Sequence, residues 1–253
     1  MIAGNSLFDL YDSDSYLESP YFQALKAGEK RDREPYNAYN NVLKSLDTMT
    51  EKKRLLDVGC SYGAFLEMAE EHGWEAYGVE ISSKAYSYAV EQRKLNIQNC
   101  TLESAEYPDD YFSVVTLWDV VEHLDDPLST LREIHRVLKA DGVLMIFTIN
   151  QKSLINAVGH LIYALSFKKI VSPLVLLYDI HHNFFFNKRT LEHLLKQAGF
   201  DRRLKIAWMD SKIERWQSVP IPPLLSLGTK ILDFAARLMG NRYRMIYYAG
   251  KGT

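Results

Sequence analysis

The stretch KKRLLDVGCSYGAFLEMAEEHGWEAYGVEIS, from Lys52 to Ser82, decides the fold of this chain. It holds two short apolar runs with the composition of β-strands, and a helical pattern lies between them. Gly59 and Gly63 follow the first run, and glycine in such a turn lets the backbone approach a ligand closely. Glu80 closes the second run. The stretch therefore predicts a glycine turn and a carboxylate at the ends of two adjacent strands.

The alternation of strands and helices continues along the chain. Predicted strands span residues 54–60, 75–81, 99–102, 112–121, 143–149, 202–209 and 243–249, and predicted helices span 36–46, 63–72, 82–95, 127–139 and 188–198. Strands separated by helices of this length form right-handed crossovers, which predicts an α/β fold with a parallel sheet and helices on both faces. Ligands of such sheets bind beyond the carboxyl ends of the strands.

Composition limits the class of protein. The 253 residues are 47% apolar and 25% charged, so a large core can form. A net charge of -2 gives no overall attraction to nucleic acid or anionic lipid. Cys60 and Cys100 are the only cysteines, which makes no disulfide framework and no zinc-type spacing. This cysteine usage favours a reducing cytoplasm, and no signal peptide is visible at the N-terminus, so we expect a cytoplasmic protein.

Two insertions interrupt the α/β pattern, at residues 151–186 and 210–242. The uncharged run Leu154–Phe167 has 14 residues, fewer than the ~18 that a membrane span needs. In 224–239, apolar residues recur at helical spacing and Lys230, Asp233 and Arg237 fall on the opposite face. We expect a helical cap over the carboxyl ends of the strands, packed internally or in a homodimer. Peripheral membrane contact through 154–178 and 224–239 is the alternative.

The glycine turn lacks the features of a phosphate-binding loop. A dinucleotide fingerprint reads G-x-G-x-x-G, whereas this turn is G-x-x-x-G with Ser61 at the position of the second glycine. The chain has no G-x-x-x-x-G-K-[ST] loop either. Glu80 can accept two hydrogen bonds from a ribose diol, so a ligand with ribose but no phosphate fits better. The alternative is a purely structural turn, since any α/β protein needs glycines between strands and helices.

Four segments in order resemble one known family. LLDVGCSYGAF, YGVEIS, LESAEYPDDYFSVVTLWDVVEHLDDP and LREIHRVLKADGVLMI are similar to motifs of the class I S-adenosylmethionine-dependent methyltransferases, in the branch that includes ubiquinone-biosynthesis-type O-methyltransferases. The resemblance covers Leu55–Asn150 and extends through HHNFFFNKRTLEHLLKQAGF at 181–200. It implies a Rossmann-like sheet of seven strands, mostly parallel, with the last strand antiparallel. Ser61 departs from the family's D-x-G-x-G-x-G motif at a tolerated position.

The resemblance also implies a domain plan and a cofactor site. The plan is an N-terminal lid and helix at 1–50, a cofactor-binding core at 51–150, the apolar insertion at 151–186, and the rest of the core at 187–253. The cofactor, S-adenosyl-L-methionine, would leave as S-adenosyl-L-homocysteine. Its methionine part would meet Asp57, Gly59, Cys60, Ser61 and Gly63, its ribose Glu80, its adenine Ile81, Ser104 and Ala105, and its sulfonium Trp118 and Asp119.

The expected reaction is transfer of a methyl group to a small-molecule hydroxyl of a sugar, phenol or lipid-linked compound. Such an acceptor must lose a proton, and histidine removes protons near neutral pH. His182 is the first candidate for this base, followed by His181 and His123, with His160 weaker. Each could instead be a structural imidazole. No metal-ligand set is visible, so we expect a metal-independent reaction.

Two other functions remain open from the sequence. One is a module that binds the cofactor but is inactive and uses the insertions as partner surfaces. The other is an N-methyltransferase or protein methyltransferase. Nucleic acid is not expected as a partner, because the sequence shows neither a basic stripe with interleaved aromatic residues nor an N-P-P-Y-type motif.

Overall fold

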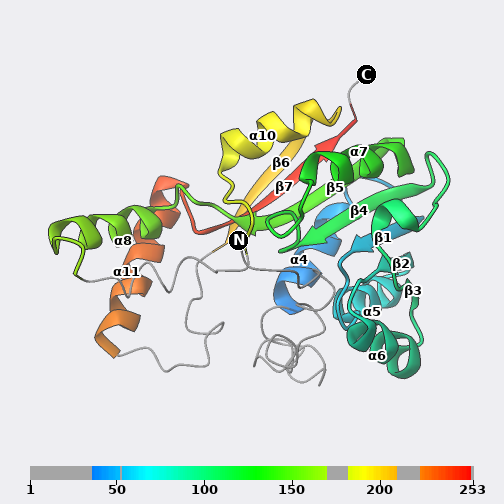
Figure 1. The fold of residues 1–253 in the computed structure, drawn as a ribbon, viewed down its shortest axis with the longest axis horizontal. Coiled ribbons are helices and arrows are strands. Elements are labelled where there is room, and N and C mark those ends of the chain that lie inside the picture. Colours follow the sequence, from blue (N-terminus) through cyan, green and yellow to red (C-terminus); the bar gives the residue numbers. More distant parts are fainter. Residues whose placement is uncertain (1–35, 52, 170–181, 210–222, 252–253) are drawn as a thin grey trace, which may run out of the picture.

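A computed structural model describes residues 36–51, 53–169, 182–209 and 223–251 of the chain (Figure 1). The predicted N-terminal lid, His181 and the residues before 223 in the second insertion lie outside the described residues. The first described element is the helix α4, Tyr36–Leu46, which matches the predicted helix at 36–46. It buries one face, because Tyr39, Val42 and Leu43 recur at helical spacing and all point into the core.

One seven-stranded sheet forms the centre of the molecule, in the order β3-β2-β1-β4-β5-β7-β6. The strands are β1 Arg54–Val58, β2 Glu75–Val79, β3 Asn96–Gln98, β4 Phe112–Trp118, β5 Leu138–Ile149, β6 Arg202–Met209 and β7 Arg244–Gly250. The first five run parallel, and β7 runs antiparallel between β5 and β6. The predicted mostly parallel sheet with an antiparallel last strand is therefore confirmed.

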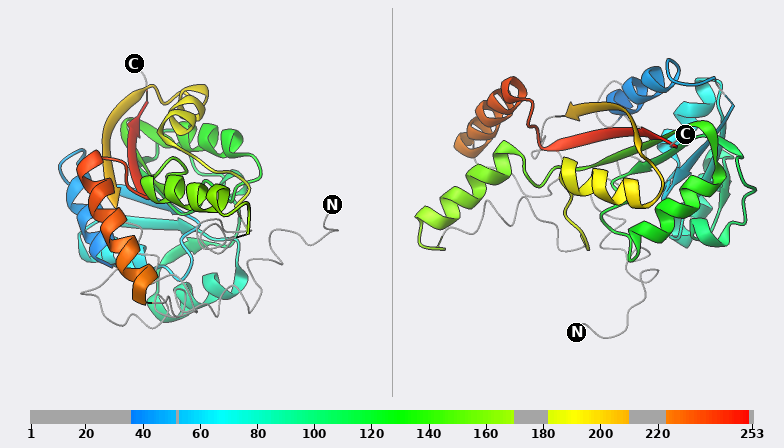
Figure 2. Two further views of the ribbon diagram at one scale, coloured as in Figure 1. Left: turned by 90° about the vertical axis from the view of Figure 1, so that its left-hand side faces the viewer. Right: turned by 90° about the horizontal axis from the view of Figure 1, so that it is seen from above.

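Helices cover both faces of the sheet (Figure 2). α4, α5 (Ala64–Glu71) and α6 (Ser83–Arg93) pack on one face, and α7 (Pro127–Val137) and α10 (Lys188–Gln197) pack on the other. Successive strand residues point to opposite faces, so Leu55 joins one core cluster and Leu56 joins the other. Both side chains are fully buried. This two-sided burial explains why the central strands are apolar throughout instead of alternating.

The predicted strand at 99–102 is wrong. The third strand lies earlier, at Asn96–Gln98, where Ile97 pairs with Gly78 of β2 and enters the core. Asn99 ends it, because its side-chain amide donates to the main-chain oxygens of Glu80 at 2.7 Å and Ile81 at 3.2 Å. A short 3-10 turn, Leu102–Ser104, follows instead of a strand.

Other boundaries move by a few residues for local reasons. β4 ends at Trp118 and not at 121, because Asp119 takes a left-handed conformation with φ 51°. β5 starts at Leu138, ahead of the predicted 143, and an irregularity in its pairing with β4 absorbs the extra residues. α7 begins as predicted, with the Asp126 carboxylate accepting from the Ser129 N–H at 3.1 Å.

The two insertions form an arm that projects beyond the sheet (Figure 1). We call α8 (Leu154–Leu165) and α11 (Pro223–Met239) together the arm; the two helices contact each other. A small cluster of Ile149, Ile155, Leu232 and Tyr243 packs at its base. Within the described ranges, no helix combines the length and apolarity required to cross a bilayer.

Candidate functional site

The glycine turn sits at the carboxyl end of β1, as predicted. Gly59 and Gly63 both adopt left-handed conformations, with φ 69° and φ 76°. A Cβ on Gly59 would lie 2.8 Å from Val120 Cγ2, and one on Gly63 would collide with Leu95. Ser61 also has a positive φ of 49°, which costs a side-chain residue energy that glycine would not pay. The turn is therefore held in a shape that brings main-chain atoms to the edge of the sheet.

Glu80 fixes this turn to the next helix. Its side chain is buried at the end of β2, where one carboxylate oxygen accepts from the Ser61 N–H at 2.7 Å. The other oxygen accepts from the Ser82 N–H, also at 2.7 Å. Ser82 is itself the N-cap of α6 and accepts from the Ala85 N–H. Glu80 thus joins the ends of β1 and β2 into one rigid edge.

A second carboxylate, Asp57, lies buried on β1 behind the turn. Thr116 of β4 donates its hydroxyl to Asp57 Oδ1 at 2.6 Å. Burial, aided by the negative charge of Glu80, raises the pKa of Asp57 to about 8, although the hydrogen bond from Thr116 works in the opposite direction. Burial and both carboxylates also raise the pKa of the Cys60 thiol, so Cys60 is a small buried residue and not a reactive one.

The remaining predicted contacts lie along the same edge. Ile81 is half-buried after β2, and Ala105 is buried next to the 3-10 turn. Ser104 is exposed there, and its hydroxyl accepts from the Thr101 hydroxyl at 3.3 Å. Trp118, at the end of β4, packs between Tyr39, Phe65 and Phe147, with ring centroids 4.7 to 5.3 Å apart. Trp118 is therefore both a core residue and part of this edge.

Asp119 has a partner that the sequence did not suggest. Arg244, the first residue of β7, lies 3.0 Å from Asp119 Oδ2 and is largely buried. Its guanidinium also lies 5.0 Å from the centre of the Phe147 ring. Desolvated charges are costly unless they are paired, so this pair is mutually dependent. It places a fixed positive and a fixed negative group between β4 and β7.

A third carboxylate, Glu122, is buried close to this ion pair. Neither of its carboxylate oxygens accepts a hydrogen bond of ordinary geometry within the described part of the chain, although Thr148 lies near. Burial and the Asp119 charge raise the pKa of Glu122 to about 8, while Thr148 and Arg244 lower it. The main-chain oxygen of Glu122 accepts from the Asn183 N–H at 2.9 Å and the Phe184 N–H at 3.0 Å.

Those main-chain bonds bring two of the candidate histidines together. The rings of His123 and His182 are 4.7 Å apart between centroids and meet edge to face. The Asn183 side-chain amide donates to the His123 main-chain oxygen at 2.9 Å, which fixes the segment after the first insertion against the loop after β4. His160 lies apart from them, exposed on α8 of the arm. His182 and His123 therefore meet next to Glu122, whose pKa responds to the charges of Asp119 and Arg244.

Residues 29–203 match the family described as methyltransferase domain, which is well over half of the chain. The chain belongs to this family. This places it among the class I S-adenosylmethionine-dependent methyltransferases, as the four sequence segments predicted. In the described ranges of this methyltransferase, no group of three or more His, Cys, Asp or Glu side chains is arranged to hold a metal ion.

Curated relatives of the methyltransferase carry one recurring name. This chain is 34% identical over 119 residues to the ubiquinone biosynthesis O-methyltransferase of Aeromonas salmonicida, a match that covers 42% of this chain and 50% of that protein. The protein of the same name from Ruegeria pomeroyi is 37% identical over 103 residues, covering 39% and 42%. The chain thus spans about half the length of the curated relatives it matches.

Solved structures share the fold of the methyltransferase. A SAM-dependent methyltransferase from Archaeoglobus fulgidus has a TM-score of 0.59 and 20% identity, covering 92% of this chain and all of that one. Phosphoethanolamine N-methyltransferase 2 from Haemonchus contortus, solved with S-adenosyl-L-methionine, has a TM-score of 0.65 and 17% identity, covering 99% and 61%. At these identities the likeness concerns the fold alone.

The residues along the edge fit the family's cofactor. The Ser61 hydroxyl, the Trp118 indole N–H and Asp119 Oδ1 are buried, and none has a hydrogen-bond partner among the residues that the structure describes. These groups sit beside the buried carboxylates Asp57 and Glu80. Buried polar atoms without partners are uncommon in folded proteins and call for a ligand or a water. Ammonium and hydroxyl groups of a ligand suit the acceptors on Asp119, Asp57 and Glu80, whereas the Trp118 N–H needs an acceptor such as a carboxylate on the ligand.

The buried carboxyl of Glu122 gives a pH-dependent prediction. In the unfolded chain the Glu122 carboxyl loses its proton at its ordinary pKa of 4.5, whereas in the folded protein it keeps the proton up to a pH of about 8. The free energy of unfolding therefore falls as the pH rises from 4.5 toward 8. Glu122→Gln mimics the protonated form. We expect its free energy of unfolding to equal that of the wild type near pH 4.5 and to exceed it increasingly up to pH 8, by at most about 1.4 kcal/mol per pH unit. Above that pH the difference stays level.

Chemical denaturation of both proteins across this pH range measures the effect. Glu91→Gln, at an exposed position of α6, is the matched control and should show no such trend. A constant difference between Glu122→Gln and the wild type at every pH would mean that Glu122 is ionised in the folded protein.

Proposed function

We propose that this methyltransferase moves a methyl group from S-adenosylmethionine to a hydroxyl group of a small molecule. The observation that carries the proposal is the His123–His182 contact, which is held next to Glu122 by the main-chain bonds of Asn183 and Phe184. When bound, the cofactor supplies an activated methyl group on a sulfonium. Asp57 would hold its amino group and Glu80 its ribose, while the glycine turn would follow its methionine part.

The protein would mainly align the acceptor and remove its proton. In-line transfer from an activated donor needs orientation and exclusion of water more than further activation. A hydroxyl acceptor needs a base, and an imidazole nitrogen of His182 is the group we propose to take that proton. The backbone bonds of Asn183 and Phe184 to Glu122 support this role, since they hold His182 in one place. His123 would orient the ring of His182 through their edge-to-face contact.

A methyl-transfer screen tests the proposal. Purified protein is incubated with tritiated S-adenosylmethionine and panels of sugars, phenols, lipid-linked compounds, amines and proteins. Label on a hydroxyl supports the proposal, and label on nitrogen or on a protein reassigns the acceptor class. Cofactor binding without transfer to any panel would favour the alternative, an inactive cofactor-binding module.

We further propose that the arm contacts a membrane surface. Large apolar side chains that are exposed among the described residues gather on the arm and just after α8: Leu161, Ile162, Leu165, Phe167, Leu227, Ile231, Phe234, Leu238 and Met239. Phe167 is 88% exposed and Leu238 is 75% exposed. Large apolar side chains exposed in such number on one part of a molecule indicate an interaction site. Lipid-like acceptors would then reach the site from the bilayer side.

Flotation with liposomes measures this contact. We expect the wild type to float with neutral and with anionic vesicles, because buried apolar area supplies the binding. Phe167→Ser/Leu238→Ser should lose flotation, whereas Glu91→Gln, at an exposed position of α6, should keep it. Wild-type protein that stays in solution with both vesicle types, and sediments as a homodimer, would assign the apolar face to a second copy of the chain.

A further inference from the structure

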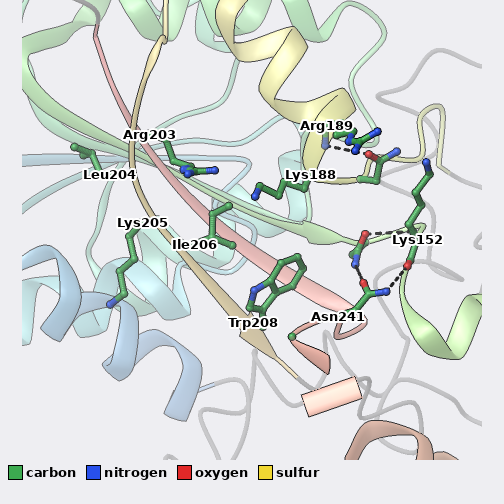
Figure 3. A pocket seen from close by; sticks show the side chains of 12 residues that line it. Lys152, Lys188, Arg189, Arg203, Leu204, Lys205, Ile206, Trp208 and Asn241 are labelled. Carbon is green, nitrogen blue, oxygen red and sulfur yellow. Dashed lines mark hydrogen bonds between the residues drawn. The ribbon is translucent and has the colours of Figure 1, made fainter. Parts of the chain in front are cut away.

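A basic groove lies at the base of the arm (Figure 3). It has a volume of about 860 Å³ and runs between β6 and the start of α10. Among the described residues that line it there is no carboxylate, and five are cationic: Lys152, Lys188, Arg189, Arg203 and Lys205. Trp208 also lines it, further along β6. The size falls in the range of sites for small molecules, which is roughly 300–1,000 Å³.

The cations reach the groove from three separate elements. Lys152 follows β5, Lys188 and Arg189 occupy the first turn of α10, and Arg203 belongs to β6. Lys188 and Arg203 extend toward one another across the groove in Figure 3. Lys205 turns toward α4, where its ammonium lies 3.1 Å from Ser45 Oγ, so it adds charge rather than a contact.

The base of the groove is built from ordered polar groups. The buried Asn150 donates its side-chain amide to Asn241 Oδ1 at 2.9 Å. Asn241 in turn donates to the Lys152 main-chain oxygen at 2.8 Å. On the opposite wall, Asn187 caps α10 in a capping box with Thr190. The backbone that carries Lys152 and Lys188 is therefore fixed in advance of any ligand.

Structural roles explain only part of this charge. Cations on an exposed edge strand discourage pairing with another chain, which suffices for Arg203 and Lys205. It does not explain Lys188 and Arg189, which sit at the positive end of the α10 dipole, where anions and not cations are favoured. Within the described part of the chain, these cations form a single ion pair, between Arg203 and Glu192 at 3.0 Å. An anion in the groove would offset the repulsion among the rest.

We propose that this groove binds a phosphate-bearing ligand. Lysine ammonium groups and the arginine fork both suit phosphate oxygens, and arginine can bind them in bidentate fashion. Trp208 offers an apolar surface for a ring or chain attached to the phosphate. β6 lies three positions from β4 in the sheet, roughly 14 Å at ordinary strand spacing. The β6 wall of the groove thus lies apart from the end of β4, and the proposal does not depend on the proposed function.

The test uses the full-length protein with the cofactor site filled by saturating S-adenosylhomocysteine. Calorimetry with inorganic pyrophosphate probes a soluble phosphate, and flotation with phosphatidylglycerol against phosphatidylcholine vesicles probes a lipid headgroup. The groove variant is Lys188→Glu/Arg203→Glu. The control variant, Arg132→Glu/Lys196→Glu, changes charge equally at exposed positions of α7 and α10 outside the groove. Lys188→Ala/Arg203→Ala avoids repulsion with Glu192, and thermal melting checks that every variant folds.

We expect the groove variants to bind pyrophosphate about 10- to 100-fold more weakly, or to lose the preference for anionic vesicles, while the control variant matches the wild type. Weaker pyrophosphate binding by the groove variants in calorimetry identifies a soluble phosphate compound as the ligand. If the groove variants lose only the preference for anionic vesicles in flotation, the ligand is a lipid headgroup. Wild-type protein that binds neither probe, or groove and control variants that lose binding equally, would overturn the proposal.

Discussion

Turnover of a hydroxyl acceptor should fall by about 10²–10⁴-fold in His182→Ala, with little change in cofactor affinity. The reason is that the acceptor would lose its base while the cofactor edge, formed by Asp57, Glu80 and the glycine turn, stays intact. The measurement is steady-state transfer of labelled methyl groups over a range of pH, together with calorimetric titration of the cofactor. Loss of activity that raising the pH partly restores would point to a missing base.

Two companion variants separate this role from simple packing. His193→Ala changes an exposed histidine of α10 and should leave turnover unchanged. His123→Ala removes the ring that contacts His182 and should lower turnover less than His182→Ala does. Near-wild-type turnover in His182→Ala would remove the base function from this residue and direct attention to His181.

Cofactor affinity should fall by roughly 1.5–3 kcal/mol in Glu80→Ala, because the ribose would lose a charged hydrogen-bond acceptor. The change should also destabilise the fold. The Ser61 and Ser82 N–H groups each donate to this carboxylate at 2.7 Å and would both lose their acceptor. Calorimetry gives the first effect and chemical denaturation gives the second.

Glu80→Gln distinguishes the two effects of Glu80. Glutamine keeps one acceptor oxygen, so it should retain more of the fold's stability than alanine while still weakening the cofactor. Glu91→Ala on the exposed side of α6 serves as the control and should change neither quantity. Equal cofactor affinity in the wild type and both Glu80 variants would contradict the contact with ribose.

The sequence predicted those parts of the molecule that depend on neighbouring residues. The glycine turn and Glu80 lie within one short stretch, and their positions follow from strand ends that periodicity locates. The strand at 99–102 was misplaced because β3 has only Ile97 to mark it, and because the Asn99 side chain ends it through contacts with another loop. Such a contact joins separate segments and leaves no local pattern.

The same limit applies to the polar groups of the site and the groove. Asp119 and Arg244 are 125 residues apart and meet only because β7 inserts between β5 and β6. The groove collects Lys152, Lys188 and Arg203 from three elements, so the sequence shows no basic stripe even though the structure has a basic surface. Long-range strand order creates both features, and single-sequence patterns do not report strand order.

Both helices of the arm leave the sheet at one small junction. Asn150 joins the residues after α11 through hydrogen bonds to Asn241 and Arg242, and the Asn156 amide of α8 donates back to the Asn150 oxygen. Pairing between β5 and β7 continues right up to it, ending at Ile149 and Arg244. Either helix can therefore lengthen, shorten or change its outer face without altering the register that brings Arg244 to Asp119. If the arm admits the acceptor, as proposed above, acceptor range and cofactor binding are free to evolve at different rates.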